Sequence, residues 1–130
     1  MTKAELLIEE IEALQPYLDE EVGESGEEVL ERMRKLQSYL SRTGSIWVEA
    51  KVLLRAKRST EIAKTILDVA RENFLSKALQ NALLESVCLK EEELVDKAER
   101  ANRTCFHQLD SLRSILSYEK TDLQLNKTGY

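Results

Sequence analysis

Ser45 to Tyr118 is a stretch without glycine or proline, and it reads SIWVEAKVLLRAKRSTEIAKTILDVARENFLSKALQNALLESVCLKEEELVDKAERANRTCFHQLDSLRSILSY. One straight helix of this length would exceed the diameter of a domain of this size, because each helical residue adds about 1.5 Å. We therefore expect residues 45–120 to fold back as two long antiparallel helices. The predicted fold class is all-α, a long helical hairpin or coiled-coil-like bundle.

Shorter helices are expected to precede the hairpin and to pack against it. The first lies within the acidic residues 1–24 and begins at Thr2, in a Thr-x-x-Glu capping box. Pro16 should kink this helix near Ile11 to Leu14 or end it there, because its ring displaces the carbonyl four residues back.

A second short helix is expected within residues 25–44. Thr43-Gly44-Ser45 should end it, since glycine suits a left-handed C-cap and Ser45 could cap the next helix. After the hairpin, residues 121–130 are expected to form a polar, frayed tail. The length of 130 residues predicts one domain.

The composition favours a soluble helical protein with an aliphatic core. Hydrophobic residues make up 42% of the chain and charged residues 33%, but aromatic residues only 5%. Since no apolar run approaches the roughly 20 residues of a membrane span and no signal peptide is recognisable, we expect a cytoplasmic protein without a membrane partner. Cys88 and Cys105 are then expected to be reduced core thiols, with a disulfide as the alternative.

The C-terminal helix of the hairpin, about 90–119, has the most regular apolar stripe. Its members recur every three or four residues: Leu94, Ala98, Ala101, Cys105, Leu109, Leu112 and Leu116. Two long helices present more apolar seam than two short helices can cover, and this predicts a homo-oligomer. The candidate interface residues are Trp47, Cys105, Phe106, Leu109, Leu112 and Leu116.

Charge is distributed unevenly along the chain, whose net formal charge is −5. Residues 1–31 carry eleven acidic side chains and one basic side chain, whereas positive charge is densest between residues 51 and 64. We call the five basic residues of that region the basic segment: Lys51, Arg55, Lys57, Arg58 and Lys64. Two interpretations stay open. The basic segment pairs with the acidic N-terminal residues and nearby acids, or it binds nucleic acid or a small anionic ligand.

No arrangement of residues predicts catalysis, a metal site or a cofactor. His107, Asp110 and Ser114 fall on one side of a helix, where we expect neither a cleft nor an oxyanion hole. Cys105 and His107 are two residues apart, so a helix points them to different faces and they cannot bind one metal ion together. We therefore expect a protein that acts by binding and is not an enzyme.

Two stretches carry a resemblance to a known group of proteins. They are Asn102–Asp110 with Leu112–Lys120, and Tyr39–Gly44 continuing to Ala50-Lys51, and the resemblance extends over about half of the chain. They resemble small uncharacterised helical proteins carried by bacteriophages and prophages. The resemblance implies a phage accessory protein in the host cytoplasm that binds a host or phage protein complex, with inhibition of host defence as one such role. It supplies no catalytic residues.

Overall fold

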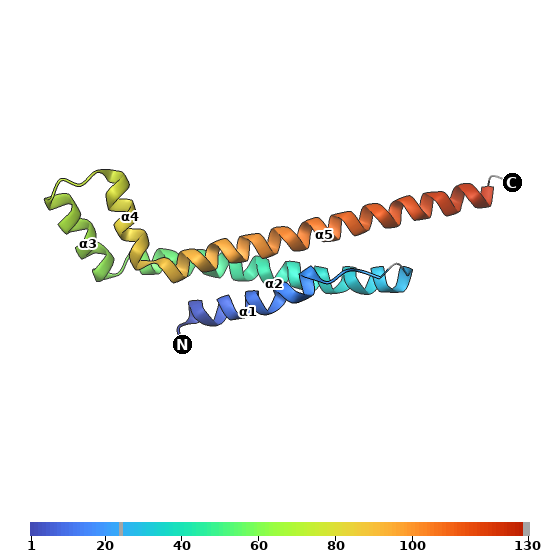
Figure 1. The fold of residues 1–130 in the computed structure, drawn as a ribbon, viewed down its shortest axis with the longest axis horizontal. Helices are drawn as coiled ribbons and strands as arrows, with labels where there is room; N and C mark the ends of the chain where they lie inside the picture. The colour runs from blue at the N-terminus through green and yellow to red at the C-terminus, as the bar shows by residue number, and fades with distance from the viewer. Residues whose placement is uncertain (24, 129–130) are drawn as a thin grey trace.

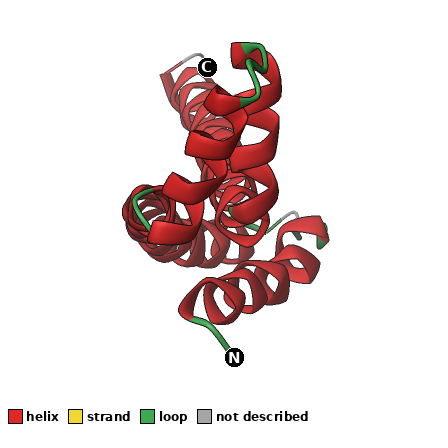
Figure 2. Ribbon diagram, turned by 90° about the vertical axis from the view of Figure 1, so that its left-hand side faces the viewer, coloured by secondary structure: helices red, strands yellow, loops and turns green. Residues whose placement is uncertain are grey.

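The computed structural model describes the backbone of residues 1–23 and 25–128, and the side chains of 1–23, 25–118 and 120. The described chain is helical, with five helices and no strand: α1 (Lys3–Asp19), α2 (Gly26–Arg58), α3 (Glu61–Glu72), α4 (Lys77–Val87) and α5 (Leu89–Thr128). Figure 1 shows α2 and α5 running antiparallel as a rod with α1 along its side. The view along the rod in Figure 2 shows the same all-helical arrangement. The all-α prediction is confirmed.

The long antiparallel pair differs from the predicted one. Its partners are α2 and α5, of 33 and 40 residues, whereas the sequence predicted that residues 45–120 alone would form it. Residues 61–87 form a short α3–α4 hairpin at one end of the rod instead (Figure 1). Only α1 remains as a short N-terminal helix packed against the long pair.

The predicted helix end at Thr43-Gly44-Ser45 is wrong, because α2 continues through these residues to Arg58. Gly44 does not adopt a positive φ. The buried positions of α2 keep helical spacing on both sides of Gly44: Val29, Arg32, Leu36, Thr43, Ile46, Ala50 and Leu54. A glycine inside a helix costs about 1 kcal/mol relative to alanine, which is less than the burial of these side chains contributes.

Helix α1 runs through Pro16 to Asp19, so of the two expected effects of Pro16 the helix end near Ile11 to Leu14 is wrong. Proline leaves the carbonyl of Glu12 without its helical donor. Because Glu12 and Pro16 are both exposed, water can reach that carbonyl. At its start, the Thr2 hydroxyl accepts a hydrogen bond from the Glu5 amide at 3.2 Å, as the capping box predicted.

The expected frayed tail is wrong for residues 121–128, since α5 runs to Thr128; residues 129–130 lie outside the described part of the chain. The apolar stripe predicted for this helix is confirmed from Leu94 to Leu112, where all six members are buried. Among the described helices, none combines the length and the apolar character needed to cross a membrane.

Two clusters of buried side chains lie along the rod. The first core cluster joins the N-terminal part of α1 to the middle of α2 and the start of α5, and contains Ala4, Leu7, Ile8, Ile11, Ile46, Ala50, Leu94, Ala98 and Ala101. The second core cluster contains Leu18, Val29, Leu36, Cys105, Leu109 and Leu112. Helix α1 packs more extensively on α5 than on α2. A groove therefore remains between α1 and α2.

Candidate functional site

The basic segment lies mainly at the C-terminal end of α2. The Lys51 ammonium lies 4.1 Å from the centre of the Trp47 ring, and Arg55 is exposed on the same side of the helix. Lys64 belongs to α3, beyond the break at Ser59 and Thr60, so it does not continue a helical face from Lys57. The five residues thus do not share one helical face.

The acidic partner of the basic segment comes from α5. Arg58 donates to Glu92 at 2.6 Å, whereas the α1 carboxylates pair elsewhere: Glu10 with Arg42 at 2.6 Å, and Glu12 with Lys97. In the part of the chain that the structure describes, no ion pair joins residues 1–31 to the basic segment, so that part of the first interpretation is wrong. Within the described part of the chain, no acidic group lies within ion-pair distance of the other four members: Lys51, Arg55, Lys57 and Lys64.

Most of the candidate interface residues are core residues of a single chain. Cys105, Leu109 and Leu112 are buried in the second core cluster, and Leu116 packs against that cluster. Trp47 packs against the first core cluster. The assignment of Cys105, Leu109 and Leu112 to a contact between subunits is wrong, because these side chains are already buried within one chain. Phe106 alone is exposed, with its ring 5.7 Å from the ring of His107 in an edge-on contact.

Both cysteines are free and buried, as predicted. Burial raises the pKa of the Cys88 thiol and of the Cys105 thiol, because the thiolate would lose its hydration. Neither thiol is therefore placed as a nucleophile.

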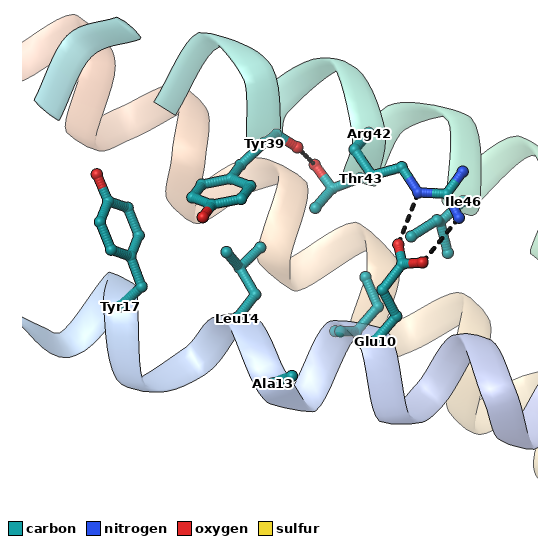
Figure 3. Close-up of a pocket in the computed structure, with 9 residues that line it drawn as sticks. Glu10, Ala13, Leu14, Tyr17, Tyr39, Arg42, Thr43 and Ile46 are labelled. Atoms are coloured by element: carbon teal, nitrogen blue, oxygen red, sulfur yellow. Dashed lines mark hydrogen bonds and ion pairs between the residues drawn. The ribbon is translucent and has the colours of Figure 1, made fainter. Parts of the chain in front are cut away.

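The groove between α1 and α2 has a volume of about 420 Å³. Figure 3 shows Tyr17 and Leu14 of α1 facing Tyr39 of α2, with the Glu10–Arg42 pair farther along the groove. The two tyrosine rings meet edge-on, 5.1 Å apart. Glu10 accepts two hydrogen bonds from the Arg42 guanidinium, at 2.6 and 2.8 Å, and these lower the pKa of Glu10.

A buried arginine fixes α1 beyond that groove. Arg32 donates to the Gln108 side chain at 2.9 Å and to the Leu18 carbonyl at 3.4 Å, and its guanidinium lies 4.1 Å from the Tyr17 ring. Gln108 donates to the same carbonyl at 2.8 Å. These contacts secure the C-terminal end of α1. The last carbonyl groups of a helix have no amide donor within the helix, and here Arg32 and Gln108 donate to the Leu18 carbonyl. Arg32 therefore has a structural role, which is to hold α1 against α2 and α5.

The turn between α3 and α4 holds a residue that the sequence did not single out. Phe74 has a φ of 56° and follows the end of α3. Its amide donates to the Arg71 carbonyl, and the Leu75 amide donates to the Ala70 carbonyl, both at 3.0 Å. This is a Schellman motif, whose left-handed position usually holds glycine. Ser76 caps the next helix, α4, and its hydroxyl accepts a hydrogen bond from the Leu79 amide at 3.3 Å.

The Phe74 side chain is 95% exposed. No local sequence signal marks it, because phenylalanine lacks the conformational freedom that identifies a glycine turn. Its position follows from the hydrogen bonds around it.

Among the described residues, no cluster of histidine, cysteine and acidic side chains could hold a metal ion. No protein-family model, curated protein or solved structure matches the chain.

Proposed function

We propose that this protein is a non-enzymatic binding protein that docks onto another protein through the tip of the α3–α4 hairpin, with Phe74 as the anchoring side chain. One observation carries the proposal. A fully exposed aromatic ring occupies a left-handed position that normally holds glycine.

The proposal follows from what Phe74 costs the isolated chain. A side chain with a Cβ in the left-handed region costs roughly 1–2 kcal/mol. A ring that is 95% exposed recovers none of that cost through burial in its own chain. Aromatic residues supply much of the binding free energy in protein interfaces, where they enter a pocket of the partner. Binding to such a pocket gives the ring a role that the free chain lacks.

The target that we propose is a host or phage protein complex, with inhibition of host defence as one form of action. Its support is the resemblance of residues 39–51 and 102–120 to small helical proteins of bacteriophages and prophages. The hairpin tip stands away from the rod in Figure 1, which would let it reach a concave surface on a partner.

The test compares capture of bacterial proteins by the full-length chain and two variants. Phe74→Ser removes the anchor, and Val48→Ser removes a similarly apolar exposed side chain from α2, away from the hairpin. We expect the wild type and Val48→Ser to capture the same bacterial proteins. The captured amount of these proteins should be at least tenfold lower with Phe74→Ser. An identical set of captured proteins for all three chains would contradict the proposal.

The basic segment supports a second candidate, binding of nucleic acid or a small anionic ligand. The specific observation is that Lys51, Arg55, Lys57 and Lys64 have no acidic partner in the described part of the chain. We expect the intact protein to retain single-stranded DNA at low salt, and Arg55→Glu to weaken this retention and its dependence on salt. Arg34→Glu, on the exposed surface nearer the start of α2, is the control. Equal retention by wild type and Arg55→Glu would exclude this role.

A further inference from the structure

The α3–α4 hairpin has almost no core of its own. Helix α3 has 12 residues and α4 has 11, lengths at which an isolated helix is marginal in water. Within the hairpin, the buried residues are Ala63 and Ala70 of α3, and α4 contributes none. Two alanine side chains supply little burial, so the hairpin gains stability if another surface covers it.

Large apolar side chains lie exposed on both helices. On α3 they are Ile62 and Val69, which are 66% and 51% exposed, with the half-buried Ile66 between them. On α4 they are Leu79 and Leu83, which are 54% and 40% exposed. Each set follows helical spacing and forms one stripe.

The two stripes lie on the same side of the hairpin. Successive helical residues are rotated by about 100°, which places the α3 stripe roughly 100° from the inward-facing Ala63 and Ala70. On α4, the stripe lies about 90° from the half-buried Leu84 and Val87. On both helices, the rotation about the helix axis from the exposed stripe to the more buried residues has the same sense when each helix is followed from its N-terminus. Because α4 runs back along α3 (Figure 1), the two rotations lead to one common face.

This face, which we call the hairpin face, carries no charged residue within its stripes, and Glu72, about one helical turn from Val69, lies at its edge. The other charged residues of the two helices lie about 90° or more from the stripes, on the same helical geometry: Glu61, Lys64, Asp68, Arg71, Lys77 and Glu85. A face without formal charge can meet a copy of itself without repulsion, which a two-fold symmetric contact requires.

We propose that the hairpin face binds the hairpin face of a second copy of this chain, so that two α3–α4 hairpins form a four-helix bundle. The apolar stripes of α3 and α4 are exposed in every folded chain. A second copy of the chain is always present in solution and can bury them. The contact uses Ile62, Val69, Leu79 and Leu83. It goes beyond the proposed docking function, which uses Phe74 at the tip.

The hairpin face is small for an interface between proteins. A 12-residue helix is about 18 Å long and two adjacent helices are about 20 Å wide, giving an outline of roughly 360 Å². Stable interfaces bury about 800 Å² on each partner, so the hairpin contact belongs with the weaker ones. We therefore expect dissociation in the micromolar range.

Analytical ultracentrifugation of the full-length chain between about 1 and 200 µM tests the proposal. The wild type should shift from monomer to dimer within this range, and Leu79→Glu should weaken dimerisation at least tenfold. Val48→Glu places the same charge on an exposed valine of α2 and should dimerise like the wild type. Circular dichroism at low concentration shows whether each variant keeps its helices. If Leu79→Glu loses helix, Leu79→Gln, which adds no charge and favours helix, takes its place.

A wild type that stays monomeric at 200 µM would overturn the proposal, as would a dimer that neither Leu79 variant weakens. Equal loss of dimer in Val48→Glu would also overturn it, because the contact would then lie elsewhere. Phe74→Ser should leave the dimer unchanged. The test of the docking function therefore stays separate from the test of the dimer.

Discussion

Gly44 of α2 lies against Asn102 of α5, and a Cβ placed on Gly44 would sit 3.4 Å from the Asn102 amide nitrogen. That nitrogen donates to the Leu40 carbonyl at 3.0 Å and to the Thr43 hydroxyl at 3.1 Å. This polar contact lies between the two core clusters. Sliding α2 along α5 would leave the Asn102 amide among apolar side chains without a partner, so the contact favours a single register.

Gly44→Ala should raise the free energy of unfolding by about 0.5–1 kcal/mol, because alanine favours the helix and its Cβ meets Asn102 at ordinary contact distance. Gly44→Val should lower it, since the branched side chain would displace the Asn102 amide. Denaturation by urea measures both. Destabilisation by Gly44→Ala would mean that residues 43–45 form a left-handed turn in solution.

Leu109→Asp should leave the chain largely unfolded, because Leu109 is 1% exposed in the second core cluster and an unpaired carboxylate there costs several kcal/mol. His107→Ala, two residues away on the exposed side of α5, should change the free energy of unfolding by less than about 0.5 kcal/mol. Circular dichroism and thermal melting test both variants. A large loss of melting temperature in His107→Ala would show that the histidine is buried in solution.

Glu10→Gln should remove part of the acid sensitivity of the fold. The Arg42 hydrogen bonds lower the pKa of Glu10 in the folded chain, so their stabilisation is complete above the unfolded pKa of about 4.3 and is lost as pH falls through the folded value. The pair is partly exposed, and its contribution should stay below about 1 kcal/mol.

Melting temperatures of wild type and Glu10→Gln should therefore differ at pH 6 and converge near pH 3. Glu9→Gln is the control, because its exposed carboxylate has no ion-pair partner in the described part of the chain. Curves for Glu10→Gln that run parallel to the wild type over the whole pH range would contradict the assigned pair.

The two thiols should react slowly with Ellman's reagent in the native protein and completely in guanidinium, because both are buried and burial raises their pKa values. Cys88 should react faster than Cys105. It caps the end of α4 beside the poorly covered hairpin, whereas Cys105 lies in the second core cluster. The single variants Cys88→Ala and Cys105→Ala separate the two rates. Faster reaction at Cys105 would place the less stable region in the rod.

The sequence by itself determined the all-α class, the stripe of α5 and several helix starts. The spacing from Leu94 to Leu112 has no other periodic interpretation, and the capping side chains of Thr2 and Ser76 act within three residues of themselves. Such features depend on neighbours along the chain. They can be derived before the packing is known.

The tertiary structure decided whether α2 passes through Gly44, because burial of Thr43 and Ile46 on α5 outweighs the local preference of glycine for a turn. It also decided that Glu10 pairs with Arg42 and that Arg58 pairs with Glu92. Charge totals along the sequence cannot predict these pairs, since Coulomb energy depends on separation in space. The exposed left-handed Phe74 likewise follows from how α3 ends and α4 begins, because the backbone there is fixed by hydrogen bonds to earlier carbonyls.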